Sequence, residues 1–111
     1  MTVVDFYDEA KVLERKPDYS TRKDLLDADS FSVVVYAYGG YADSRLHDCG
    51  NDEFFYVIQG NVEMQVENES IPMKAGEGIL IKAGEKHKRR VRDGALIMMI
   101  TKQPHQHRYY E

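Results

Sequence analysis

The sequence predicts an all-β protein, a sandwich or barrel built from many short antiparallel strands. Segments of alternating apolar and polar residues follow one another, with glycine, asparagine or aspartate turns about every 8 to 12 residues. The chain has 111 residues, which is enough to bury one hydrophobic core. No internal repeat or low-complexity linker divides the sequence, so we expect a single domain.

Residues 1–30 are expected to form an N-terminal arm. Within it, residues 5–14 have a mild helical pattern that ends before Pro17, so we expect a short helical or extended segment that packs on the barrel or on a partner subunit. Residues 31–103 should form the barrel and residues 104–111 a C-terminal tail. The strands expected in the barrel are residues 32–38, 44–48, 53–58, 62–67, 70–73, 78–81, 86–92 and 95–101.

Strand periodicity assigns side chains to faces, because residues two apart in a strand share a face. Glu53, Phe55 and Val57 should therefore point into the barrel. Further along the chain, the residues expected to line the same interior are Val62, Met64 and Val66. The residues expected on the opposite face, which is also apolar, are Phe54, Tyr56 and Ile58.

The Asp93-Gly94 pair predicts a two-residue hairpin with a type I′ turn. Counting outward from this turn places Arg92 opposite Ala95 and His87 opposite Ile100. The interior face should then carry His87, Val91, Leu96, Met98 and Ile100. The opposite face should carry Lys88, Arg90, Arg92, Ala95, Ile97, Met99 and Thr101.

Four side chains that bind metals lie on these predicted strands. Strand spacing should aim His47, Cys49, Glu53 and His87 at one interior point. Two imidazoles and a carboxylate form a facial set with open coordination positions, which suits divalent iron, manganese, nickel or zinc. Glu53 is also the candidate catalytic residue, because it or a bound water would handle protons. A vestigial site that holds only water is the alternative.

Cys49 leaves three interpretations open. As a thiolate ligand it would favour a softer metal such as zinc or copper. It could instead be a small buried hydrophobe, or an outward-facing thiol. The tail adds His105 and His107, which we expect in a mobile or partner-contacting segment. If the tail folds over the barrel mouth instead, one of these histidines could replace the ligand expected at Cys49.

These residues resemble the two signatures of the cupin superfamily, G-x5-H-x-H-x3/4-E-x6-G and G-x5-P-x-G-x2-H-x3-N. The residues that match are His47, Glu53, Gly60, Gly76, Gly84 and His87. The departures are Tyr41 for the leading glycine, Cys49 for the second histidine, Lys82 for the proline and Val91 for the asparagine. The chain therefore resembles a small single-domain cupin of the RmlC-like type. This resemblance implies a double-stranded β-helix, or jelly-roll barrel, and a homodimer that meets sheet to sheet.

Arg89 should point into the same interior as His87, two residues earlier. An arginine cannot lose its charge, so its burial requires an anion or a carboxylate partner. Glu53 or an acidic ligand could serve, which makes Arg89 a candidate docking group for a carboxylate or phosphate substrate. Alternatively, Arg89 lies near the barrel mouth and reaches solvent.

The composition of the chain limits the classes of molecule that it is expected to bind. A net charge of −4 and a pI near 5.5 argue against general affinity for nucleic acid or acidic membranes. The single cysteine excludes an intrachain disulfide, and no apolar run approaches the ~20 residues of a membrane span. The start of the sequence does not resemble a signal peptide, so we expect a cytoplasmic protein with a small-molecule ligand.

Three functions remain open on the sequence. The first is a metal-dependent enzyme of the dioxygenase, isomerase or decarboxylase type that acts on a small oxygen-rich or acidic molecule. The second is a non-catalytic module that binds or senses a small molecule or metal. The third is a structural domain whose surface contacts another protein. Cupin-like folds carry many activities, so the site must decide among them.

Overall fold

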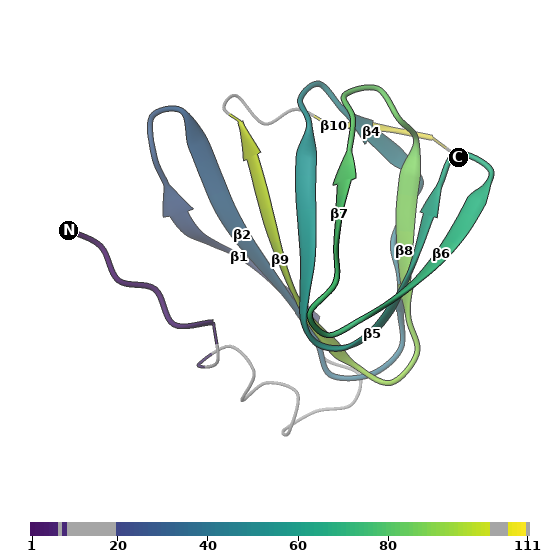
Figure 1. Ribbon diagram of the computed structural model, residues 1–111, viewed down its shortest axis with the longest axis horizontal. Coiled ribbons are helices and arrows are strands. Elements are labelled where there is room, and N and C mark those ends of the chain that lie inside the picture. Colours follow the sequence, from purple (N-terminus) through teal and green to yellow (C-terminus); the bar gives the residue numbers. More distant parts are fainter. Residues whose placement is uncertain (7, 9–19, 103–106, 111) are drawn as a thin grey trace.

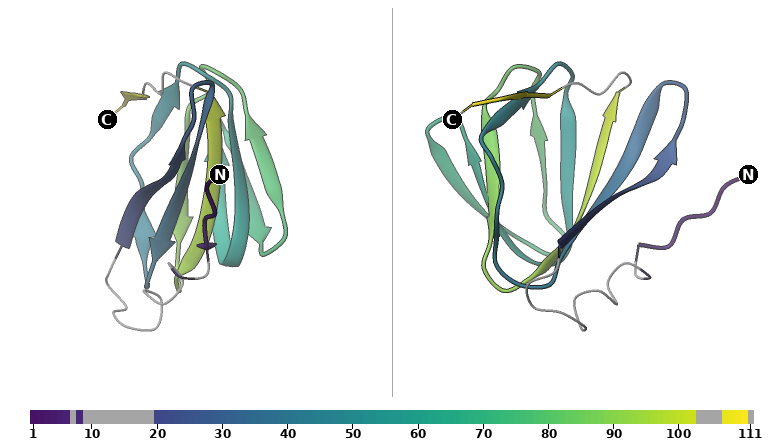
Figure 2. Two further views of the ribbon diagram at one scale, coloured as in Figure 1. Left: turned by 90° about the vertical axis from the view of Figure 1, so that its left-hand side faces the viewer. Right: turned by 180° about the vertical axis from the view of Figure 1, so that it is seen from behind.

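The strands of the protein form one curled antiparallel sheet that folds back on itself as a half-open barrel (Figures 1 and 2). The computed structural model describes residues 1–6, 8, 20–102 and 107–110. The strands are β1 (Ser20–Asp27), β2 (Phe31–Tyr38), β3 (Ala42–Asp43), β4 (His47–Cys49), β5 (Glu53–Val66), β6 (Glu69–Lys74), β7 (Gly78–Ile81), β8 (His87–Val91), β9 (Ala95–Lys102) and β10 (His107–Tyr109). Their main order is β1-β2-β9-β5-β8-β4-β10, with β3 beside β8, and β6 and β7 beside β5.

Strand β5 belongs to both walls of the barrel. Its first half pairs with β9 and β7, and its second half pairs with β6 and β8. The strand bends at Gly60, whose φ is +87° and where an added Cβ would lie 2.6 Å from the carbonyl oxygen of Gly94. We predicted two strands separated by Gly60-Asn61, and the structure shows one strand of 14 residues that is bent there.

The predicted interior face of β5 is confirmed by burial. Glu53, Phe55 and Val57 are each 1% exposed, and Val62 and Met64 are buried beyond the bend. The apolar core inside the barrel consists of Val34, Tyr36, Phe55, Val57, Val62, Met64, Met73, Ile81, Val91, Ala95, Ile97 and Met99. The alternation of the sequence thus determines this face on each side of the bend, and it changes phase between Val57 and Val62, where the register against β9 also shifts.

The predicted hairpin at Asp93-Gly94 is wrong. Strand β8 pairs with β3, β4 and β5, whereas β9 pairs with β2 and β5, so the chain crosses from one wall to the other at this point. A type I′ turn needs a positive φ at both central residues, and only Gly94 has one. The dipeptide allows a sharp change of direction, but long-range pairing with β5 decides where each strand goes.

The face predicted for β9 is therefore also wrong. Ala95, Ile97 and Met99 pack in the interior core, whereas Met98 and Ile100 are half-buried on the outside. Leu96 packs in a second, outer cluster with Val35 and Ala37. For β8, by contrast, the predicted alternation is confirmed, because His87, Arg89 and Val91 are buried and Lys88 and Arg90 are half-buried.

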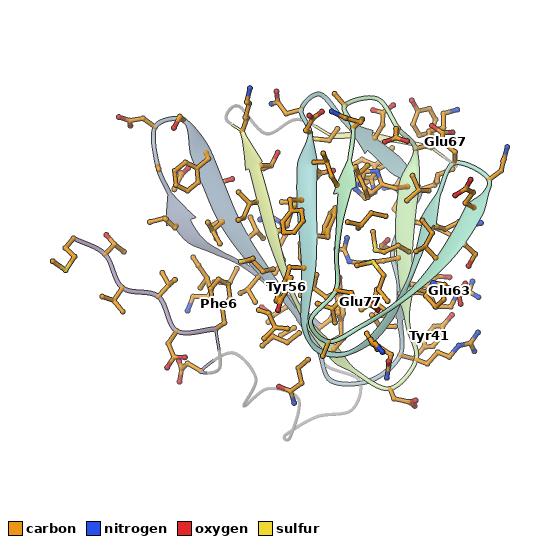
Figure 3. The ribbon with its side chains drawn as sticks, in the orientation of Figure 1. Phe6, Tyr41, Tyr56, Glu63, Glu67 and Glu77 are labelled. Carbon is orange, nitrogen blue, oxygen red and sulfur yellow. The ribbon has the colours of Figure 1, made fainter. Side chains whose placement is uncertain are left out.

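Two strands lie outside the predicted set, one near each end of the chain. Strand β1 falls in the expected arm 1–30 and pairs with β2, and β10 falls in the expected tail 104–111 and pairs with β4. Phe6, labelled in Figure 3, packs against the outer cluster. Phe6 and Asp8 have helical backbone, and most of the helix predicted over residues 5–14 lies outside the described residues. The described part of the chain contains no helix that is long and apolar enough to span a membrane.

Candidate metal site

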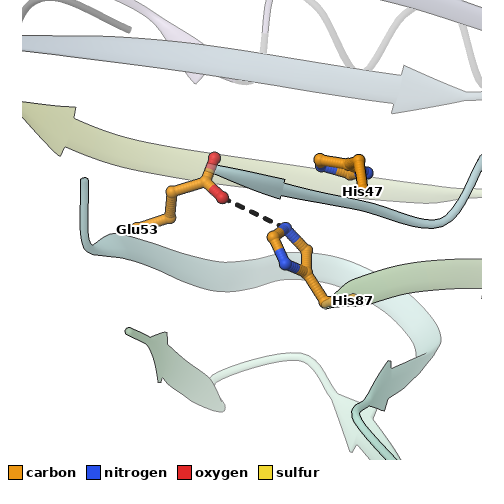
Figure 4. Close-up of side chains that lie close together, drawn as sticks. All are labelled: His47, Glu53 and His87. Carbon is orange, nitrogen blue, oxygen red and sulfur yellow. Dashed lines mark ion pairs between the residues drawn. The ribbon is translucent and has the colours of Figure 1, made fainter. Parts of the chain in front are cut away.

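Three of the four predicted metal ligands come together inside the barrel (Figure 4). His47 begins β4, Glu53 begins β5 and His87 begins β8. All three are buried, with exposures of 6%, 1% and 0%, respectively. His47 and His87 are register partners in the antiparallel pair of β4 and β8, which brings their rings to the same face.

The distances in this group fit a shared cation. One possible ligand atom from each of the three side chains lies within 4.8 Å of the other two. Nε2 of His87 is 3.1 Å from Oε1 of Glu53, and the two imidazole centroids are 4.3 Å apart. Two ligand atoms about 2.1 Å from one metal and about 90° apart lie about 3.0 Å from each other. The observed spacing thus matches two adjacent coordination positions.

Backbone carbonyls fix the orientation of both imidazoles. Nδ1 of His47 lies 2.8 Å from the carbonyl oxygen of Arg45, and Nδ1 of His87 lies 2.9 Å from that of Glu85. A carbonyl oxygen only accepts, so Nδ1 of each ring carries a proton, and in the neutral tautomer Nε2 has the lone pair. Nε2 of His87 makes no hydrogen bond of acceptable geometry within the described structure. This arrangement is the usual support for a metal-binding histidine.

The connection before His87 is held to the rest of the site by hydrogen bonds. The Asp52 carboxylate accepts a hydrogen bond of 2.9 Å from the backbone N–H of Ala83 and lies 3.6 Å from Nζ of Lys82. The Ala83 amide thereby holds the pKa of Asp52 below its ordinary value. Gly84 N–H donates to the carbonyl oxygen of Cys49 at 3.0 Å. These contacts link the segments that carry all three ligands.

Burial also prepares His47 chemically. Desolvation in the barrel lowers the pKa of His47, and the neighbouring His87 and Arg89 lower it further. The hydrogen bond to the Arg45 carbonyl and the Glu53 carboxylate act in the opposite direction without reversing the shift. The imidazole is therefore neutral at pH 7, the form that coordinates a metal.

Cys49 lies on the same short strand as His47 and is 3% exposed. It is not a member of the group of ligand atoms formed by the other three residues. Direct ligation by its thiolate stays a prediction. His105 lies outside the described residues, as does the side chain of His107, so the alternative of a tail ligand is neither supported nor contradicted.

Arg89 is buried, with an exposure of 6%, so it does not reach solvent at the barrel mouth. Its Nε donates a hydrogen bond of 2.9 Å to the hydroxyl of Tyr38, and its Cζ lies 4.0 Å from the ring centroid of Tyr36. We did not anticipate these two tyrosines from the sequence. The signal was present, because Tyr36 and Tyr38 are two apart on a strand and share the interior face.

The C-terminal strand covers one side of the site, which was not predicted. The ring of Tyr109 lies 5.4 Å from the His47 ring, and Arg45 stacks over Tyr109 at 4.7 Å. The Tyr110 hydroxyl donates a hydrogen bond of 2.5 Å to the buried carboxylate of Asp48. The alternative in which the tail folds over the barrel is thus the one that the described residues 107–110 adopt.

A cavity of about 670 Å³ lies elsewhere, between the bend of β5 and the end of β8. Its lining includes Glu63, Lys74, Arg90 and Asp93 but none of the candidate metal ligands. Arg90 and Lys88 also form ion pairs with Asp43, at 3.2 and 3.6 Å. We place the chemistry at the buried histidines, because this cavity contains none of the candidate metal ligands and its Arg90 is already paired with Asp43.

Comparison with known proteins agrees with this architecture. The cupin domain family matches residues 32–101, and no curated protein matches significantly. Similar solved structures include the protein TT1209 from Thermus thermophilus, with a TM-score of 0.76, 21% identity and coverage of 92% of this chain and 97% of that one. The polyketide cyclase RemF from Streptomyces resistomycificus has a TM-score of 0.70, 19% identity and coverage of 87% and 78%.

A third similar structure is an RmlC-like cupin from Shewanella frigidimarina, with a TM-score of 0.71, 16% identity and coverage of 75% of each chain. At these identities the structural likeness shows the fold alone, and it confirms the predicted jelly-roll barrel. The family match spans more than half of the sequence and contains all three residues of the buried group. The chain therefore belongs to the cupin domain family.

Proposed function

We propose that this protein is a metal-binding cupin that acts on a small oxygen-rich or acidic molecule at His47, Glu53 and His87. The observation that carries the proposal is the convergence of three buried ligand atoms within 4.8 Å of one another. An unneutralised carboxylate in this interior would be costly, and a divalent cation would offset its charge. Because a backbone carbonyl accepts from Nδ1 of each imidazole, Nε2 is the nitrogen left to bind such a cation.

Three protein ligands leave coordination positions open on iron, manganese, nickel or zinc. When bound, the metal would polarise a carbonyl or carboxylate oxygen of the substrate as a Lewis acid. The barrel excludes bulk water from this point, since all three ligands are buried. Glu53 either completes the ligand set or carries protons beside it. These roles are common to dioxygenase, isomerase and decarboxylase chemistry.

A second candidate function is binding or sensing without turnover. It is favoured by the shortness of the connections around the site, residues 50–52 and 82–86, which offer no long segment to close over a substrate. The polyketide cyclase RemF has the same fold, so a cupin of this kind is compatible with enzymatic activity. Its substrate is not assigned to this chain.

The metal content of protein purified without an affinity tag or chelator tests the proposal. We expect about one equivalent of a divalent metal by elemental analysis, with a substantial loss in His87→Gln. The matched control is Lys88→Gln, because Lys88 neighbours His87 but faces the outside of the barrel and pairs with Asp43. A folded protein that neither contains a metal nor binds added Fe²⁺, Mn²⁺, Ni²⁺ or Zn²⁺ would contradict the proposal.

A further inference from the structure

Arg89 carries a charge inside the barrel that the metal site does not use. It lies on β8 two residues after His87, on the same interior face, and is 6% exposed. A buried guanidinium stays charged, so its position costs free energy unless an anion or polar groups surround it. The residues around Arg89 therefore indicate which kind of ligand it can bind.

No described carboxylate forms an ion pair with Arg89. Asp24, Asp43, Asp52 and Glu53 each form an ion pair with a residue other than Arg89. Glu53, the acidic residue on the interior face, lies 3.1 Å from His87. Within the described part of the chain, no acidic side chain balances the charge of the Arg89 guanidinium.

Aromatic side chains hold the guanidinium in one orientation. Tyr36 covers the guanidinium at 4.0 Å from Cζ to the ring centroid, and the Tyr38 hydroxyl accepts a hydrogen bond from Nε. The ring of Phe55 lies 5.6 Å from Cζ of Arg89 and 6.0 Å from the His87 ring. Arg89 and His87 therefore share one interior face of β8 and have Phe55 as a common neighbour.

We propose that Arg89, oriented by Tyr36 and Tyr38, is the carboxylate-binding group of the metal pocket. The ligand is a short monocarboxylate with a second oxygen donor next to the carboxylate, as in 2-oxo and 2-hydroxy acids. A planar guanidinium matches the two oxygens of a carboxylate, and the second oxygen would face the metal. This inference rests on the proposed function, because it assigns the substrate class of the same site.

A carboxylate fits this interior better than a phosphate. A monocarboxylate is neutralised by Arg89 alone, whereas a phosphate dianion would also have to draw on the metal, because the nearest basic neighbours on the strand, Lys88 and Arg90, pair with Asp43 on the outside. The rest of the described interior is mainly apolar. A ligand with a single charge leaves the metal to Glu53 and to the second oxygen donor.

The test is calorimetric titration of the protein loaded with one equivalent of Zn²⁺. The probes are pyruvate, its neutral amide pyruvamide, and inorganic phosphate. We expect pyruvate to bind at least about tenfold more tightly than either of the others, because pyruvamide lacks the charge and phosphate lacks the neighbouring keto oxygen that would face the metal. Equal or tighter binding of pyruvamide or phosphate would overturn the carboxylate assignment, as would a lack of pyruvate binding.

Variants locate the contact. Arg89→Met should weaken pyruvate binding at least about tenfold, and Tyr38→Phe should weaken it severalfold by releasing the guanidinium. Arg90→Met is the matched control, because Arg90 is adjacent but lines the separate groove beyond the bend of β5. If Arg90→Met loses affinity and Arg89→Met does not, the ligand binds in that groove and the inference is wrong. If Arg89→Met does not fold, Tyr38→Phe and Arg89→Lys decide, and unchanged affinity in both overturns the inference.

The same titrations on metal-free protein separate this inference from the proposed function. Arg89 should still distinguish pyruvate from pyruvamide without metal, although more weakly. Failure to take up Fe²⁺, Mn²⁺, Ni²⁺ or Zn²⁺, with retained Arg89-dependent pyruvate binding, would contradict the metal proposal and support the carboxylate group. Normal Zn²⁺ uptake with equal pyruvate affinity in wild type and Arg89→Met would support the metal proposal and contradict the carboxylate-binding role of Arg89.

Discussion

His47 and His87 are direct cross-strand partners, on β4 and β8, with their ring centroids 4.3 Å apart. Strand β4 has only three residues, so its register against β8 rests on few contacts of its own. A slip of one residue would turn His47 to the opposite face. Strand β10 pairs along the other edge of β4, from His107–Cys49 to Tyr109–His47, and supports this register.

Tyr110→Phe should weaken that support. The substitution removes the hydrogen bond to Asp48, which is 5% exposed, and should lower the free energy of unfolding by about 1–3 kcal/mol. Chemical denaturation measures this change. The control is Tyr41→Phe, since Tyr41 is 61% exposed and should change stability by less than about 0.5 kcal/mol. Equal stability of the two variants would show that Tyr110 does not anchor β4.

Glu53→Gln should abolish tight metal binding without unfolding the protein. The amide keeps the shape of the carboxylate but not its charge, so metal affinity should fall by at least about a hundredfold. The metal-free variant should melt at or above the wild-type temperature, because a buried charge has been removed. Zn²⁺ titration and thermal melts measure both effects, with Glu63→Gln on the outer side of β5 as control. Unchanged metal affinity would remove Glu53 from the ligand set.

The stability of the metal-free protein should fall as the pH decreases below about 6.5. The pKa of His47 is lowered in the folded state, so between that value and the ordinary pKa near 6.5 the unfolded chain binds a proton that the folded chain does not. The contribution of His47 to the free energy of unfolding is thus complete above about pH 6.5. Below that pH it is lost at no more than about 1.4 kcal/mol per pH unit.

The comparison for this pH effect is His47→Asn, whose amide can still donate to the Arg45 carbonyl but does not titrate. Unfolding free energies of both proteins should be measured from pH 7.5 to 5.5. Groups common to both cancel in the difference, which should shrink or reverse towards acid pH. Parallel curves would show that His47 is not responsible for the pH dependence.

Met99→Ala should destabilise the protein by about 2–5 kcal/mol, because Met99 is fully buried in the interior core. Met98→Ala is a matched control, since Met98 is the half-buried neighbour on the outer face and should cost clearly less. Denaturant titration at one protein concentration compares the two. The hairpin register expected from Asp93-Gly94 would give the opposite order.

We also expect a homodimer that meets through the outer face of the sheet. Val33, Ile100, Phe54 and Leu80 form a row across four strands, and Phe54 and Leu80 remain 36% and 52% exposed. Such an apolar row favours a protein interface. Light scattering at micromolar concentration should give twice the mass of one chain, and Leu80→Lys should reduce it to one, whereas Tyr41→Lys should not. A monomeric wild type would contradict this expectation.

The sequence was sufficient for the parts of the structure that depend on local alternation. The interior faces of β5 and β8 follow from period-2 patterns, and these faces carry Glu53, His87 and Arg89. His47, the remaining member of the buried group, was identified from its match to the first cupin signature. A strand pattern tells which side chains share a face but not which strands are neighbours.

Pairing between distant segments was therefore beyond local reasoning. Asp93-Gly94 has the composition of a tight hairpin, yet β8 and β9 both pair with the long bent strand β5 and not with each other. Strand β1 is rich in polar residues because it lies at an end of the strand order, where few of its side chains are buried. The spacing of Tyr36 and Tyr38 indicates a shared face, but their contact with Arg89 became clear only once β2 and β8 were placed in opposite walls.

The distribution of tyrosines has a practical consequence for spectroscopy. The chain has no tryptophan, so its ultraviolet emission comes from eight tyrosines alone. Tyr109 touches the ring of His47, while Tyr36 and Tyr38 contact the buried arginine. Loading of either end of the pocket therefore changes the surroundings of native fluorophores, and occupancy can be followed in the unlabelled protein.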